Sequence, residues 1–260
     1  MARWFKGDLH IHSTLSPCGS LYMSPRVIVD KAYKRGLDLL AVTDHNACDN
    51  LPYVKRLAEA KGMTLIPGME LQTEEEVHLL AYFEDLETVF AFKDRIYSYL
   101  PDVENDPDYF GDQVIVDEED NIVGIESKLL INSLMLSLDQ CVELVKEHGG
   151  VAIPAHVNRE PFGIIGQLGF IPEYLGFDAV EVCSRTDVSE RVLVKWPDLK
   201  RYALITSSDA HFPNDIGRVF TLFLMENPCW SCFRDALHRG EAAVLIPKFH
   251  ERSEAMAEEG

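Results

Sequence analysis

Two histidines near the start of the chain, His10 and His12, are separated by a single apolar residue, Ile11. Together with Leu9 they alternate between polar and apolar, the period of two that is typical of a β-strand with one buried face. Residues two apart on a strand point to the same side, with Cα atoms roughly 6.6 Å apart. Because a metal–nitrogen bond is only about 2 Å long, both imidazoles can bind one cation. An isolated pair of this kind can equally be two hydrogen-bonded histidines on an edge strand.

Further residues of ligand type follow other short apolar runs of the chain. They are Asp44 and His45, Glu70, His78, His156, and Asp209 and His211. Each of them alone has an ordinary alternative role, such as capping a helix, serving a turn or lying satisfied in the core. The ordinary roles together would require every such residue to fall at a strand end by accident, so we favour a shared metal site. Barrel enzymes place their active sites at the carboxyl ends of the strands.

The elements that would position these residues alternate between strands and helices. Strands are expected over 7–13, 37–42, 63–67, 77–82, 151–156, 177–182, 202–206 and 221–224. Helices are expected over 24–35 and 52–61 and in a segment after the strand 77–82 that ends at about residue 100. Two more are expected, one from a capping box at Ser137–Gln140 to His148 and one after Pro228. This alternation predicts an α/β fold with a parallel sheet, and about seven such units predict a barrel.

The alternation is interrupted over residues 101–130. An acidic, irregular stretch is followed there by a hairpin that is expected between Gln113 and Gly124. We interpret the segment as an insertion or lid on one domain covering 1–248, because the regular pattern resumes directly after it. The last residues, 249–260, are charged and are expected to form a frayed tail.

Four short blocks of this sequence resemble the four motifs of the PHP (polymerase and histidinol phosphatase) superfamily. They are Asp-Leu-His-Ile-His-Ser from residue 8, Thr-Asp-His from residue 43, Pro-Ala-His from residue 154 and Ser-Asp-Ala-His from residue 208. Glu70 and His78 match the two intervening ligand positions, so that the resemblance spans about residues 7–225. It implies a distorted (β/α)7 barrel that holds two or three divalent ions at the C-terminal ends of its strands. Within the superfamily the chain is most similar to the stand-alone phosphoesterases.

The resemblance also implies how the ligands are shared among the ions. The first ion would be held by His10, His12, Glu70 and Asp209, the second by Glu70, His78 and His156, and the third by His45 and His211. Related phosphoesterases commonly add an Asp or His from the loop after the His-x-His strand. Here that loop, 13–19, has neither, and Cys18 is its strong ligand type. Mixed imidazole and carboxylate ligation suits zinc, manganese or iron, and a Cys18 thiolate would favour zinc.

Other polar residues near the ligands are candidates for supporting roles. Asp8 and Asp44 flank ligands, and we expect them to orient a ligand ring. Arg159 is the best-placed anchor for a phosphate, followed by Arg185 and then Arg218, although each could form a surface ion pair instead. Bound divalent ions lower the pKa of water toward about 7, so a metal-bound hydroxide would attack phosphorus.

The acidic composition bears on the substrate. The formal net charge is −19, from 43 acidic and 24 basic residues. Such a surface repels polyanions, so a long nucleic acid is disfavoured, whereas a small anion drawn in by bound metal is not. No apolar run approaches the roughly 20 residues that cross a bilayer, and the first strand leaves no room for a signal peptide. We therefore expect a cytoplasmic protein without a membrane partner, with its six cysteines reduced.

The leading interpretation is a metal-dependent phosphoesterase that hydrolyses a small phosphorylated substrate, either a phosphomonoester or a nucleoside bisphosphate. A histidinol-phosphate phosphatase is the first alternative, and a short-oligonucleotide exonuclease is the second. A metal-binding module without catalysis is an alternative of another class, and the nearly complete ligand set argues against it. The sequence leaves the oligomeric state open.

Overall fold

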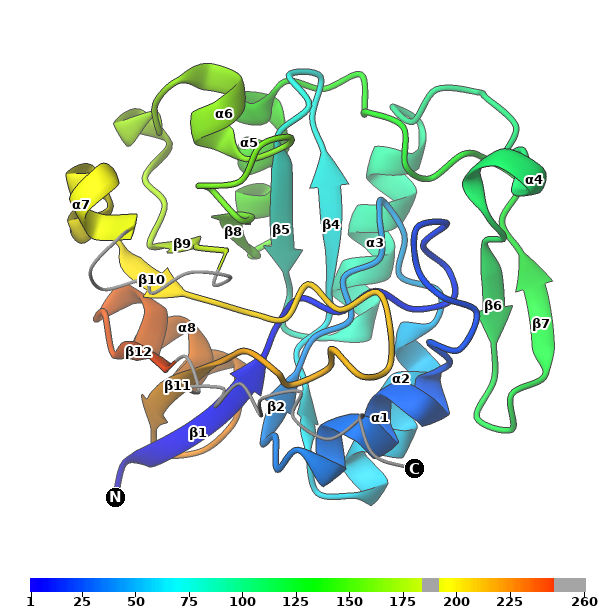
Figure 1. The fold of residues 1–260 in the computed structure, drawn as a ribbon, viewed down its shortest axis with the longest axis horizontal. Helices are drawn as coiled ribbons and strands as arrows, with labels where there is room; N and C mark the ends of the chain where they lie inside the picture. Colours follow the sequence, from blue (N-terminus) through cyan, green and yellow to red (C-terminus); the bar gives the residue numbers. More distant parts are fainter. Residues whose placement is uncertain (184–191, 246–260) are drawn as a thin grey trace, which may run out of the picture.

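The computed structural model describes residues 1–183 and 192–245 (Figure 1). Its strands are β1 (Arg3–Asp8), β2 (Leu39–Leu40), β3 (Thr64–Leu65), β4 (Gly68–Gln72), β5 (His78–Tyr82), β6 (Val114–Val116), β7 (Ile122–Ile125), β8 (Val151–Pro154), β9 (Ala179–Glu181), β10 (Ala203–Ile205), β11 (Phe220–Met225) and β12 (Ala242–Leu245). Its helices are α1 (Pro25–Lys34), α2 (Leu51–Ala60), α3 (Leu86–Tyr97), α4 (Pro107–Phe110), α5 (Leu138–Glu147), α6 (Ile164–Leu168), α7 (Leu193–Lys195) and α8 (Trp230–His238), with short 3-10 turns η1 (Glu173–Leu175) and η3 (Pro197–Arg201).

The helix boundaries follow local signals in the sequence. Ser24 caps α1 by accepting a hydrogen bond from the Val27 amide, and Pro25 occupies the first turn. The capping box at the start of α5 is present in full, with Ser137 and Gln140 each bonding the other's backbone amide. The expected helix after Pro228 is α8. Its long apolar side chains pack inward, where Phe233 is fully buried.

The strands of the described residues form four sheets. The largest has the order β12-β11-β1-β2-β3, in which β1 runs parallel to β2 and antiparallel to β11. The sheet β4-β5-β8 is antiparallel throughout, β9 and β10 are parallel, and β6 and β7 form the expected antiparallel hairpin. The prediction of a parallel sheet therefore holds for β1-β2-β3 and for β9-β10 but is wrong for the other strand pairs. The link over 73–77 is too short for the crossover that parallel strands need, so β4 and β5 pair as a hairpin.

One core cluster is shared by most of these strands. Its members include Phe5, Leu39, Leu80, Tyr82, Ile153, Ala179, Ile205, Phe223 and, from α8, Phe233. Two isolated bridges join segments of different sheets: Ile11 after β1 pairs with Ala210 after β10, and His45 after β2 pairs with Glu70 within β4. The ladders within the described residues do not join into a closed barrel. The structure therefore shows a mixed α/β fold with a common apolar interior.

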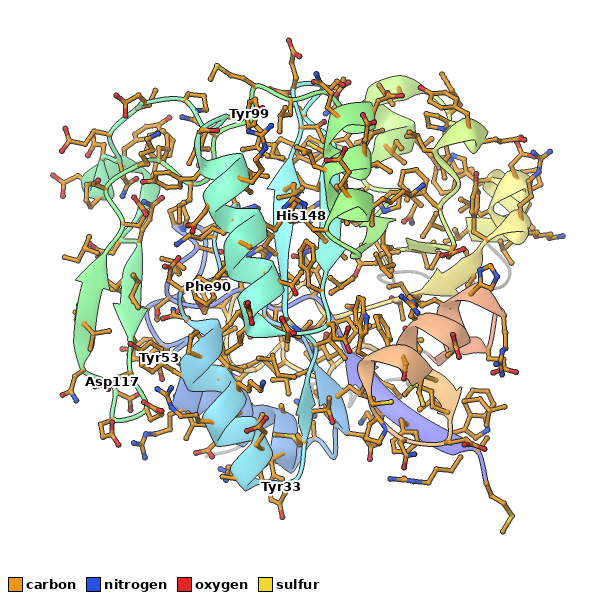
Figure 2. The ribbon with its side chains drawn as sticks, turned by 180° about the vertical axis from the view of Figure 1, so that it is seen from behind. Tyr33, Tyr53, Phe90, Tyr99, Asp117 and His148 are labelled. Carbon is orange, nitrogen blue, oxygen red and sulfur yellow. The ribbon has the colours of Figure 1, made fainter. Side chains whose placement is uncertain are left out.

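Helices cover the outside of the strands, and the hairpin β6–β7 stands at one edge of the molecule, opposite β9 and β10 (Figure 1). Seen from behind, α2 and α3 lie across the strands with the hairpin beside them (Figure 2). The Asn50 side chain ties the hairpin to the body, because it accepts from the Val116 amide and donates to Ser13 and Thr14. Among the described residues no helix is long and apolar enough to cross a membrane.

The first strand ends earlier than its alternating pattern predicts. β1 stops at Asp8, and the segment that carries His10 and His12 leaves the ladder. The Leu9 amide donates to the Ser207 hydroxyl, and Ile11 forms its bridge with Ala210. The chain stays extended, so both histidines still point to the same side, with their Nε2 atoms 3.2 Å apart.

Candidate metal centre

The structure brings the predicted ligands together from separate strands. His45 follows β2, Glu70 lies within β4, and His156 follows β8. His78 corrects the expectation of strand-end placement, because it is the first residue of β5. β5 runs antiparallel to β4 and β8, so its start lies beside Gln72 and the end of β8. A residue at the beginning of this strand therefore reaches the same site as residues at the ends of the others.

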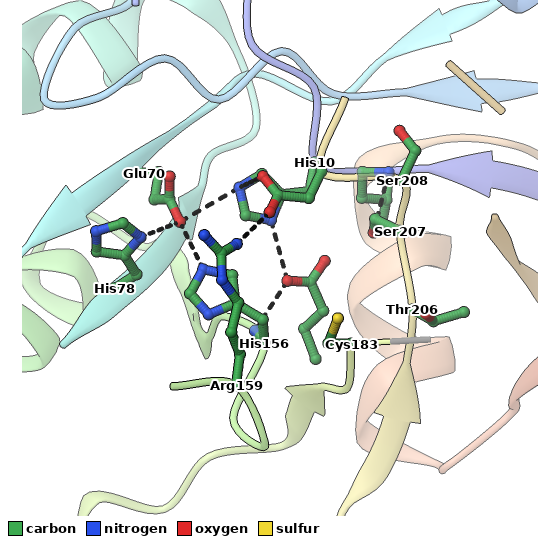
Figure 3. A network of polar contacts seen from close by, with 12 residues as sticks. His10, Glu70, His78, His156, Arg159, Cys183, Thr206, Ser207 and Ser208 are labelled. Atoms are coloured by element: carbon green, nitrogen blue, oxygen red, sulfur yellow. Dashed lines mark hydrogen bonds and ion pairs between the residues drawn. The ribbon is translucent and has the colours of Figure 1, made fainter. Parts of the chain in front are cut away.

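Glu70 lies at the middle of the cluster (Figure 3). Its carboxylate oxygens lie 2.8 Å from Nδ1 of His78 and 3.3–3.4 Å from single nitrogens of four other histidines. These four are His10, His12, His45 and His156. The Glu70 side chain is 1% exposed, so the carboxylate has no access to bulk water that would screen its charge.

Asp209 closes the cluster on the side of His10 and His12. Its Oδ1 lies 3.5 Å from Nε2 of His10 and 3.4 Å from Nε2 of His12. Together with Glu70, these residues place two imidazoles and two carboxylates around one point. This is the set assigned above to the first ion, and four such ligands suit a tetrahedral or wider coordination sphere.

A third group of ligand atoms lies beside the first. His12, Cys18 and His45 each offer an atom within 4.8 Å of the others, and so do His12, Asp209 and His211. The rings of His12 and His211 stack with centroids 4.3 Å apart. Cys18, although exposed as a residue, therefore has its sulfur near the position predicted for a third ion.

Several atoms of the cluster are buried without a hydrogen-bond partner among the described residues. They are Oε1 of Glu70 and Nδ1 of His45, His78 and His156. The 2.8 Å contact between Glu70 and His78 brings charges together but lacks hydrogen-bond geometry. Nδ1 of His45 and of His78 lie against the Glu70 carboxylate, whereas His156 faces it through Nε2. Buried polar atoms are rarely left unpaired, so the convergence of the first two with Glu70 fits a cation that would satisfy them. The donor set of imidazole, carboxylate and thiol suits a transition-metal or zinc ion.

The electrostatics of the cluster also favour positive charge at its centre. Burial alone would raise the pKa of Glu70, but His78, His10 and His45 hold it well below its usual range. Burial would lower the pKa of His12, yet hydrogen bonds to Asp209 and Glu70 raise it to about 9. The buried Glu70 carboxylate thus remains ionised and, together with Asp209, favours a proton on His12, a place that a metal cation would take.

Three residues that sequence reasoning missed hold the outer nitrogens of the ligands. Oε2 of Glu181 accepts from Nδ1 of His10 at 3.0 Å and from the His156 backbone amide at 3.0 Å. The Gln72 side-chain oxygen contacts Nε2 of His78 at 3.1 Å. With the outer nitrogens held, the inner nitrogens face Glu70. An acidic residue inside the apolar run 177–182 was the available signal for Glu181.

Ser16 is the third of these residues and explains the role of Asp44. Its hydroxyl donates to Oδ1 of Asp44 at 2.7 Å, so it must accept from Nδ1 of His12, 3.0 Å away. Asp44 therefore orients a ligand ring through Ser16 rather than directly. Asp8 departs from the expectation, because its carboxylate accepts from the amides of Ser208 and Gly217 and so fixes the loop that carries Asp209.

The three candidate arginines have different places. Nη1 of Arg159 lies 2.6 Å from Oδ2 of Asp209, at the edge of the cluster (Figure 3). Arg218 is half exposed and pairs with Asp215 at 2.9 Å. Arg185 lies outside the described residues, as does the predicted tail over 249–260. Of these three arginines, Arg159 is the one that the structure places against a proposed metal ligand.

Comparison with known proteins agrees with this site. The chain matches the PHP domain over residues 8–154, more than half of its length, and a PHP-associated region over residues 195–242. The chain belongs to the PHP family. The resemblance seen in the four sequence blocks is thereby confirmed, and so is the expectation of a hydrolase acting on phosphate ester bonds.

Individual relatives differ in what their names say they act on. The chain is 24% identical over 278 residues to a 5'-3' exoribonuclease from Haemophilus influenzae, covering 88% of this chain and 99% of that protein. Two solved structures resemble it at 21% identity, which shows the fold alone. The lesion-specific endonuclease PfuEndoQ from Pyrococcus furiosus has a TM-score of 0.69 and covers 93% of this chain, which spans 58% of that one. A two-domain protein from Bacteroides vulgatus, containing a predicted PHP-like metal-dependent phosphoesterase, has a TM-score of 0.57, with coverages of 94% and 65%.

These relatives change the weight given to possible substrates. One structure of endonuclease Q contains a 27-mer duplex with an abasic lesion at the active site, and the Haemophilus protein is named an exoribonuclease. The expectation of a small ester, and the argument from net charge that a long nucleic acid is disfavoured, therefore find no support among these relatives. The comparisons support the coarser description of the chain as a metal-dependent phosphoesterase of the PHP family.

Proposed function

We propose that this protein hydrolyses phosphate esters of nucleotides or of nucleic-acid ends at the metal centre around Glu70. The observation that carries the proposal is the buried carboxylate of Glu70 with five histidine nitrogens within 3.4 Å. Bound divalent ions would supply an activated water and would neutralise phosphoryl oxygens. We propose two or three ions, of zinc, manganese or iron, held by the ligand sets given above, with Cys18 contributing to the third.

The exposure of the ligands indicates the side from which a substrate would approach. The side chain of Glu70 is 1% exposed, that of Asp209 24%, and that of Arg159 37%. The cluster therefore opens to solvent where Arg159 lies. We assign to Arg159 the binding of a phosphate oxygen, because a guanidinium gives two parallel hydrogen bonds to a phosphate. In this role its ion pair with Asp209 would hold the guanidinium at the edge of the centre.

Other features support finer parts of the proposal. Side chains of several sheets share one interior, which suits the distorted (β/α)7 barrel implied by the family resemblance. We also propose that the insertion 101–130 shapes substrate choice within one domain covering 1–248. None of the clusters of ligand-type residues found in the described part of the chain includes a residue of this insertion.

A small phosphomonoester, histidinol phosphate included, is the second candidate substrate. The net charge of −19 favours it, because an acidic surface repels long polyanions. Hydrolysis at a nucleic-acid end, which is the first candidate, requires only that the end of the nucleic acid enter the site. Most of the polyanion then stays outside.

A panel of substrates tests the proposal. The purified protein, loaded with zinc, manganese or iron, would be assayed on a 5'-phosphorylated trinucleotide, on nucleoside monophosphates and on histidinol phosphate. We expect turnover of the nucleotide-containing esters that is lost in Asp209→Asn, with the fold unchanged by circular dichroism. Turnover of histidinol phosphate alone would favour the second candidate. Full metal loading without turnover of any ester would leave the chain as a metal-binding module.

A further inference from the structure

Phe162 lies against the metal centre through both its ring and its backbone. Its ring stacks on that of His78 with centroids 4.5 Å apart and an interplanar angle of 9°. Its carbonyl oxygen accepts a hydrogen bond of 2.9 Å from the His78 amide. One face of the Phe162 ring is therefore occupied by a proposed metal ligand, and the residue as a whole is only partly buried.

The backbone conformation of Phe162 is unusual for its residue type. Its φ is +68°, in the left-handed region that bulky side chains rarely adopt. Of the five other residues besides glycine with positive φ in the described chain, His156 and Asp209 are proposed ligands and Asn46 follows a third, His45, whereas Glu76 and Asp120 are not part of the cluster. Uncommon backbone conformations cluster at functional sites, where the surrounding structure enforces them. The conformation of Phe162 belongs to this group.

The loop over 156–163 presents three kinds of side chain to one place. His156 is a proposed ligand, Arg159 lies at the edge of the centre, and Phe162 stacks on His78. The loop closes on itself at Gly163, where an added Cβ would lie 2.4 Å from the Arg159 carbonyl oxygen. One tight turn thus carries both the apolar ring that stacks on the proposed ligand His78 and the guanidinium to which we assigned the phosphate.

We propose that Phe162 determines specificity by stacking on the nucleobase next to the scissile phosphate. This inference rests on the proposed function and names the part of the substrate that the site would select. A base stacks on an aromatic side chain whatever its sequence identity, because every base has a π-face. A sugar phosphate offers no π-face, and histidinol phosphate offers only its single imidazole ring. The site would therefore prefer an ester that carries a base over the same ester without one.

The test compares two 5-phosphate esters of ribose: adenosine 5'-monophosphate, which carries a base at C1, and ribose 5-phosphate, which carries a hydroxyl there. The metal-loaded wild type should show a kcat/KM about 5- to 150-fold higher for the nucleotide, the range expected for one stacked base. In Phe162→Leu, kcat/KM should fall for adenosine 5'-monophosphate and stay unchanged for ribose 5-phosphate, so that most of the preference is lost. Phe162→Asn should have the same effect. Asparagine adopts the left-handed backbone conformation more readily than leucine, so this variant replaces Phe162→Leu if that variant folds poorly. Phe170→Leu, at another exposed aromatic residue, should keep the wild-type preference.

Metal content separates stacking on substrate from support of His78. If Phe162 served only to orient His78, both variants would lower metal content or would reduce kcat/KM equally for the two substrates, which would overturn the inference. Equal wild-type turnover of both substrates would also overturn it while leaving the phosphoesterase proposal intact. A wild type that hydrolyses no phosphate ester would refute the proposed function itself.

Discussion

The sharpest test of the metal centre is the substitution Glu181→Gln. This residue is 2% exposed, and its Oε2 holds Nδ1 of His10 and the His156 amide, each at 3.0 Å. Glutamine keeps the size and one oxygen acceptor and removes the charge. The change therefore weakens two contacts and leaves the packing of the core as it is.

The expected magnitude follows from the two contacts. A hydrogen bond to a charged group contributes about 1.5–3 kcal/mol, and one power of ten in affinity corresponds to about 1.4 kcal/mol. Loss of residues that orient metal ligands costs about 10- to 100-fold in metal affinity or activity. Both estimates agree, so we expect the dissociation constant of the ion held by His10 to rise by about 10- to 100-fold.

Titration of the metal-stripped protein with zinc or manganese, followed by calorimetry and by turnover, measures this change. Added metal should restore most of the lost activity of Glu181→Gln, because the direct ligands remain. Glu75→Gln is a matched control, since Glu75 accepts from the Leu138 amide at the start of α5 and lies outside the ligand cluster. A folded Glu181→Gln protein with wild-type metal affinity would refute the assignment of His10 as a ligand positioned by Glu181.

Three further predictions concern metal binding and stability. Binding of metal to the stripped protein should release protons and strengthen about tenfold per pH unit for each proton displaced, up to pH about 9, because contacts with carboxylates outweigh burial and raise the pKa of His12 to about 9; a constant affinity in calorimetry from pH 6 to 9 would contradict this. Cys18→Ala should lower zinc per chain in elemental analysis, with the buried Cys141→Ala as control, and equal zinc in both would make Cys18 an ordinary loop residue. Asn50→Ala should lower the free energy of unfolding by about 2–4 kcal/mol in urea titrations, because it leaves the Val116 amide unpaired in the interior and removes the contacts of the amide group with Ser13 and Thr14; a loss under about 0.5 kcal/mol would show that water replaces these contacts.

The ligand types and their clustering were within reach of the sequence. Residue chemistry and the period of two in a strand placed His10 and His12 on one side, and the order of apolar runs placed the other ligands at one site. Helix ends were equally predictable from the sequence, because Ser137 and Gln140, which cap α5, are only three residues apart. Such signals act over a few residues, so they survive in a single sequence.

Strand direction and the partners of the ligands were decided only by the tertiary structure. The antiparallel pairing of β5 puts His78 at the start of its strand rather than the end, because the short link from β4 allows no crossover. Glu181 meets His10 from a position 171 residues away, and Phe162 reaches His78 through a turn closed at Gly163. Local spacing carries no information about such contacts, because they exist only once separate strands have packed around one interior.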